Sequence, residues 1–200
     1  MEKKILRFTD TELRSEQTDD GKMIVTGYAL KFNKPTEIRS WGAKWLEQIS
    51  RSAMDTAKLD DVILSFNHNF DKLLAGTRNG SLVLSVDEIG MPISGEIVDT
   101  TEGRDVYKLI QEGLINRMSF CVEIIDDEWE EREKELDVRT ITKFGRFYDV
   151  SAVTFPAYED TSISTRSDAE VVDRSVKEHF EQKKYEEQMK RLEKLTGGKE

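Results

Sequence analysis

Three polar residues, His68, Ser119 and Asp149, stand where a β-strand would normally carry an apolar side chain. Side chains alternate between the two faces of a strand, so residues of one parity share a face. His68 has the parity of the apolar residues in the segment 62–66, and Asp149 has the parity of Phe147. Burying an unpaired imidazole or carboxylate is costly. We therefore expect these two side chains to be paired, and they could pair with each other.

A serine hydroxyl beside such a pair could carry out acyl transfer. Ser119 would attack a carbonyl carbon, His68 would take the hydroxyl proton and pass it to the leaving amine, and Asp149 would hold the imidazole tautomer. Triads of this kind are recognised by geometry rather than by chain order. The spacing is a weak signal, however, because a chain of 200 residues contains many serines and aspartates. On the stretch 63–77 alone, a hydrogen-bonded core histidine explains His68 better.

Composition argues against several other functions. The chain has 40 Asp and Glu against 30 Lys and Arg, a net charge of −10, and is a poor candidate for binding nucleic acid. No stretch approaches the roughly 20 apolar residues of a membrane span, and the N-terminus has no apolar signal region. We expect a soluble intracellular protein that binds neither nucleic acid nor membrane.

The cysteine and histidine content argues against disulfides and metal chemistry. Cys121 is the single cysteine, so neither an intramolecular disulfide nor a cysteine-based zinc site is expected. The two histidines, His68 and His179, are far apart in sequence, which disfavours a metal hydrolase and predicts no metal or cofactor. Cys121 is itself an alternative nucleophile, but a lone cysteine within a strand is more typical of packing.

The apolar pattern predicts a β-rich core domain over residues 1–165 with two short helices. Because strands and helices do not alternate regularly, it favours a mixed barrel or sandwich over a doubly wound sheet. The expected strands are 3–8, 22–33, 61–66, a hairpin over 81–98, 117–131, 136–144 and 145–158. The expected helices are 50–60, capped by Ser50 or Ser52, and 100–115, capped by Thr100 or Thr101. Residues 34–49 are expected to be a connection, and a glycine-containing loop with Gly76 and Gly80 is expected between the strand 61–66 and the hairpin.

Residues 166–200 form a separate charged helical tail in this interpretation. The segment 168–195 consists mainly of charged helix formers with sparse apolar residues. That pattern predicts a solvated helix that needs a partner, or a fragment of a coiled coil. His179 lies in this segment and is expected at the surface.

Four segments carry a resemblance to a known family: "TGYALKFN", "FNHNFDKLLAGT", "GLINRMSFCVEI" and "FYDVSAVTFPAY". In this order they resemble the HK97-type prohead (capsid maturation) proteases of tailed bacteriophages, which look related to the herpesvirus assemblins. The resemblance spans Gly27 to Ala157. It implies a β-rich α+β fold, an assemblin-like β-barrel with short surrounding helices, to which this chain adds the charged C-terminal helix.

Within this resemblance, His68 matches the catalytic histidine and Ser119 the nucleophile of the family. The acidic residue before "VS" is usually Glu, so Asp149 is a departure at the third position, and Cys121 stands where glycine is common. Assemblin-like enzymes draw an oxyanion donor from the segment after the third triad member. Because Pro156 has no N–H, that donor would come from Ala157 or Tyr158; the alternative is that Pro156 only ends a strand.

The resemblance implies a serine endopeptidase that processes scaffold and capsid proteins during procapsid maturation and also cleaves itself. It would act in the host cytoplasm, inside the assembling procapsid, and the tail over residues 166–200 is a candidate for self-removal. Since assemblins are active as dimers, a homodimer is a further expectation. The alternative is a non-enzymatic scaffold or assembly protein that acts through its charged C-terminal helix.

Overall fold

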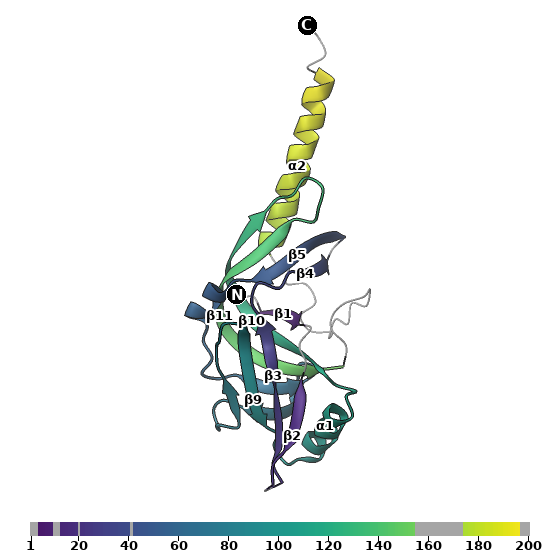
Figure 1. Cartoon of the computed structure of the whole chain (residues 1–200). Helices are drawn as coiled ribbons and strands as arrows, with labels where there is room; N and C mark the ends of the chain where they lie inside the picture. The colour runs from purple at the N-terminus through teal and green to yellow at the C-terminus, as the bar shows by residue number, and fades with distance from the viewer. Residues whose placement is uncertain (1–3, 10–12, 20, 41, 155–173, 197–200) are drawn as a thin grey trace.

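A computed structural model of the chain describes residues 4–9, 13–19, 21–40, 42–154 and 174–196 (Figure 1). The described strands pair into two sheets. The larger sheet contains β1 (Lys4–Thr9), β4 (Thr36–Ser40), β5 (Ala43–Ile49), β6 (Ile63–Phe66), β7 (Asn69–Gly76), β10 (Arg117–Glu130) and β11 (Val138–Val153). The smaller sheet contains β2 (Arg14–Gln17), β3 (Met23–Lys31), β8 (Leu82–Leu84) and β9 (Gly90–Glu96).

The long strand β11 organises the larger sheet. Along one edge it pairs antiparallel with β10. Along its other edge it pairs in parallel with two strands in turn: β5 near its start, where Val138 lies opposite Leu46, and β6 near its end, where Val150 lies opposite Leu64. The last residues of β11 therefore lie between β10 and β6, and this is where Ser119 and Asp149 are brought close to His68.

The hydrophobic core includes one face of β10 and β11 and extends to the smaller sheet. Phe120 of β10 contacts Phe144 and Phe147 of β11, with ring centroids 6.2 and 5.8 Å apart. Leu64 of β6 reaches the smaller sheet, where it packs beside Gly95 of β9. The aromatic and branched residues of these strands thus supply the buried area that holds the site's scaffold in place.

Both short helices predicted from the sequence are present, one of them as a 3₁₀-helix. The 3₁₀-helix η1 (Arg51–Thr56) is capped by Ser50, whose side chain accepts the Ser52 N–H. The helix α1 (Thr101–Gln111) is capped by Thr100, whose side chain accepts the Gly103 N–H. Each capping hydroxyl satisfies a backbone donor that the first helical turn leaves unpaired.

Several expectations for the core domain were wrong in detail. Residues 34–49 are not a connection but form the antiparallel strands β4 and β5. Residues 69–76, expected to be a loop, form β7, and β2 was not predicted at all. In addition, 136–144 and the described part of 145–158 form one continuous strand, β11. The closed barrel is not confirmed, because the described strands form two sheets and no closed ring of strands.

The first turns of the C-terminal helix α2 (Arg174–Thr196) pack against the end of β10 and the start of β11. The helix then projects away from the two sheets (Figure 1). The expectation that His179 lies at the surface was wrong. Its side chain is only 9% exposed, and its ring stacks on Trp129 with centroids 3.9 Å apart. His179 Nε2 also lies 2.9 Å from Asp137 Oδ2. In the described part of the chain, no helix is both long and apolar enough to span a membrane.

Candidate active site

A tight turn at the tip of the β6–β7 hairpin presents the imidazole. Phe66 pairs with Asn69, which leaves Asn67 and His68 as a two-residue loop. Both loop residues have positive φ, 52° and 54°, as two-residue hairpin turns of type I′ require. Asn and His occupy this left-handed region more readily than most residues, although glycine is the usual choice. His68 therefore lies in the turn. The prediction that it continues the side-chain alternation of β6 was wrong.

Hydrogen bonds fasten this turn to β11. The Asn67 N–H donates to the Ala152 carbonyl over 3.0 Å, and the His68 N–H donates to Ser151 Oγ over 2.9 Å. The Asn67 side chain adds further bonds to Thr154. Its Oδ1 accepts the Thr154 N–H and its Nδ2 donates to Thr154 Oγ1, each over 3.0 Å, and Thr154 Oγ1 also lies 3.4 Å from Asn67 Oδ1. The strained turn is thus held by several bonds, as expected where backbone strain serves a site.

Ser119 and Asp149 come from neighbouring strands of the same sheet. Ser119 on β10 lies opposite Ser151 on β11, and Cys121 lies opposite Asp149. A register shift follows Cys121, because Val122 pairs with Phe147 rather than with the residue next to Asp149. This β-bulge breaks the alternation. Phe147 therefore packs in the aromatic core, and the predicted shared face of Asp149 and Phe147 was wrong.

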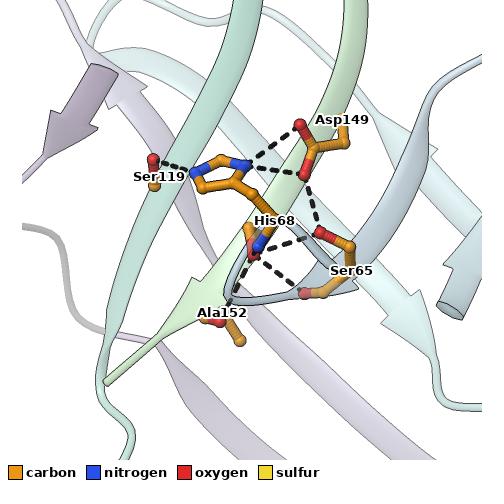
Figure 2. Close-up of polar contacts among 6 residues, drawn as sticks. Ser65, His68, Ser119, Asp149 and Ala152 are labelled. Atoms are coloured by element: carbon orange, nitrogen blue, oxygen red, sulfur yellow. Dashed lines mark hydrogen bonds and ion pairs between the residues drawn. The ribbon is translucent and has the colours of Figure 1, made fainter. Parts of the chain in front are cut away.

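The imidazole of His68 bridges the hydroxyl and the carboxylate (Figure 2). Its Nε2 lies 2.5 Å from Ser119 Oγ, and its Nδ1 lies 2.9 and 3.1 Å from the two carboxylate oxygens of Asp149. An ionised carboxylate only accepts hydrogen bonds, so a neutral imidazole that pairs with it carries its proton on Nδ1 and its lone pair on Nε2. The structure brings the three predicted residues into one hydrogen-bonded chain, and the shorter Asp side chain reaches the ring.

The site is buried. Ser119 and Asp149 are each 0% exposed, and the side chain of His68 is 9% exposed. Charges and dipoles interact more strongly in such surroundings than in water, so the Asp149 carboxylate acts strongly on the imidazole beside it. The Ser119 hydroxyl is thus closed to solvent in this conformation.

Two further hydroxyls in this network were missed from the sequence. Ser65 on β6 donates to Asp149 Oδ2 over 2.7 Å, and the Ser151 hydroxyl binds the His68 N–H. Both are 0% exposed. Their sequence signal is a serine among apolar residues of a strand, in "ILSF" and "DVSAV". Such serines are common, so the signal does not single them out without the register of β6 on β11.

The remaining predicted residues fall as follows. Ala157 and Tyr158, the expected oxyanion donors, and Pro156 lie outside the described residues, so their role stays a prediction. Cys121, the alternative nucleophile, is a buried thiol on β10. The hydroxyl of Ser119 is the candidate nucleophile that lies within hydrogen-bond distance of His68 Nε2. Among the described residues, no group of three or more His, Cys, Asp or Glu side chains is arranged to hold a metal ion.

A hydroxyl, an imidazole and a carboxylate in one chain of hydrogen bonds form the arrangement found in serine hydrolases. A comparison with protein-family models identifies the family: the model described as caudovirus prohead serine protease matches residues 9–179. The chain belongs to this family of phage capsid-maturation proteases. Searches of curated proteins and of solved structures found no match to the chain.

Proposed function

We propose that this chain is a serine endopeptidase that cleaves capsid and scaffold proteins within the assembling procapsid, with Ser119 as nucleophile, His68 as general base and Asp149 as the third member. The observation that carries the proposal is the imidazole of His68, which contacts the Ser119 hydroxyl through Nε2 and the Asp149 carboxylate through Nδ1. The family model supports the same reaction class.

The reaction would proceed in two halves. Ser119 Oγ attacks the carbonyl carbon of the scissile peptide while its proton passes to His68 Nε2, and the imidazolium so formed is stabilised by Asp149. The proton then moves from Nε2 to the leaving amine, which departs and leaves an acyl-serine. Water, deprotonated by the same nitrogen, hydrolyses the ester and restores the hydroxyl. Backbone N–H groups at Ala157 or Tyr158 remain our proposed donors to the oxyanion.

Further parts of the proposal follow from the resemblance to prohead proteases and assemblins. The enzyme would act in the host cytoplasm inside the procapsid, as a homodimer, and would cleave its own C-terminal tail over residues 166–200. The buried Ser119 supports a requirement for activation, since the hydroxyl is closed to solvent in this conformation. A protease kept closed until it is concentrated in the shell would not degrade capsid protein too early.

Co-expression with the capsid protein of the same phage tests the proposal. Ser119→Ala should fold, because it removes one hydroxyl at a cost of about 1 kcal/mol, and should abolish capsid processing. Ser94→Ala, which removes an exposed hydroxyl on β9, is the matched control and should process normally. Capsid processing that persists in Ser119→Ala would overturn the proposal.

A further inference from the structure

We propose that Ser65 is a positioning residue that fixes the Asp149 carboxylate for its work on His68. The inference rests on the proposed function of His68, Ser119 and Asp149. It adds to the network a fourth side chain whose shortest hydrogen bond is to the carboxylate, and which also lies 3.2 Å from Ser151 Oγ.

The parallel pairing of β6 with β11 places Ser65 beside Asp149. Ser65 lies opposite Ser151, and Ile63 lies opposite Asp149, so Ser65 is two residues further along the strand, on the same face as Ile63. Its hydroxyl donates to Asp149 Oδ2 over 2.7 Å, and both residues are 0% exposed (Figure 2). The same oxygen, Oδ2, lies 2.9 Å from His68 Nδ1. One carboxylate oxygen therefore serves the imidazole and Ser65 together.

The bond has a physical consequence for the carboxylate. The terminal torsion of an aspartate is broad, so the imidazole alone fixes the orientation of the carboxylate only loosely. A hydroxyl bound to one oxygen restricts rotation about that torsion. In addition, a hydrogen bond to a carboxylate is stronger than one between neutral groups. Asp149 is thereby held in the orientation in which it faces His68 Nδ1.

The geometry also separates the role of Ser65 from that of Ser119. Ser65 donates to the carboxylate, whereas Ser119 lies at the opposite nitrogen of the imidazole. Ser65 is fully buried on β6 on the far side of β11 from Ser119. Removing its hydroxyl should therefore reduce the rate of the chemical step and leave substrate binding unchanged.

The test compares Ser65→Ala with Ser81→Ala, which removes a half-buried hydroxyl that accepts the Gly76 N–H at the other end of β7. Active sites are counted by titration with a fluorophosphonate, so that a smaller folded fraction does not count as a lower rate. We expect kcat per titrated site to fall by about ten- to hundredfold in Ser65→Ala, with KM unchanged. Ser81→Ala should keep the wild-type kcat, and Ser65→Thr, which retains the hydroxyl, should recover most of it.

A spectroscopic measurement makes the test independent of turnover. The Nδ1 proton of His68, observed by proton NMR, should change its chemical shift in Ser65→Ala and keep it in Ser81→Ala. If Ser65→Ala fails to fold, Ser65→Cys preserves the volume with a weak donor and should show the same changes. An unchanged kcat per site and an unchanged proton shift would overturn the role of Ser65. A wild-type protein that cleaves nothing would instead overturn the proposed function, and the NMR comparison would still decide whether Ser65 orients the pair.

Discussion

Replacing Asp149 with asparagine should be the most informative change at the third member of the proposed Ser119–His68–Asp149 triad. Both carboxylate oxygens lie within 3.1 Å of His68 Nδ1, and Oδ2 also accepts from Ser65. Because both oxygens face the ring nitrogen, the amide introduced by Asp149→Asn would bring an N–H₂ donor close to Nδ1. The imidazole would respond by carrying its proton on Nε2, where it can no longer accept the Ser119 proton. A triad aspartate changed to asparagine in this way costs about 10⁴-fold in kcat, or about 5 kcal/mol of transition-state stabilisation.

The assay is the initial rate of cleavage of purified capsid protein, with the free energy of unfolding measured in parallel. Asp149→Asn should remain folded, at a cost of about 1 to 3 kcal/mol for the disturbed buried bonds. The matched control is Asp87→Asn, which changes an aspartate that accepts the Gly90 N–H in the turn before β9 and should lower stability without lowering kcat in the folded fraction. A kcat in Asp149→Asn within tenfold of wild type would refute the assignment of Asp149 as the third member.

Three other predictions test the scaffold and the access to the site. Asn67→Ala should destabilise the fold by about 2 kcal/mol and lower kcat, because it removes the side-chain bonds to Thr154 that hold the turn. Denaturant unfolding and the cleavage rate measure these effects. Burial raises the pKa of Asp137, but hydrogen bonds from Lys183, His179 and a backbone N–H outweigh it and hold the pKa below its ordinary value. The ionised Asp137 therefore stabilises the fold at pH values above the ordinary carboxyl pKa, and this contribution is lost as the pH falls through the lowered pKa. In unfolding measurements between about pH 5 and pH 2, the free energy of unfolding of Asp137→Asn should fall less than that of wild type. Because Ser119 is fully buried, the rate of its labelling should level off at high fluorophosphonate concentration, where opening becomes limiting; a rate that stays proportional to concentration would contradict this.

Much of the scaffold could be predicted because its signals are local. The periodicity of "KMIVTGYALKFN", the cap at Thr100 and the turn before Gly90 each depend on neighbouring residues alone. Of the strands that were not predicted, β4, β5 and β7 have exposed or half-buried residues at many positions. Their pairing partners, rather than their own composition, make them strands.

In the candidate site, too, the residue types could be predicted from the sequence, whereas the contacts between residues far apart in sequence could not. The residue types of His68, Ser119 and Asp149 suggested their chemistry, and the family resemblance selected them from many candidates. The three side chains come into contact because β6 pairs in parallel with β11 and because β11 has a bulge near Asp149. No pattern among neighbouring residues indicates either feature. Ser65 escaped prediction for this reason, since its partner lies 84 residues away in sequence.

The decisive measurement is the position of the covalent adduct that a fluorophosphonate forms with the intact protein, mapped by mass spectrometry of proteolytic peptides. The proposed mechanism predicts one adduct, on Ser119, that is absent from Ser119→Ala and present in Ser94→Ala. An adduct on another residue, or labelling that persists in a folded Ser119→Ala protein, would contradict it.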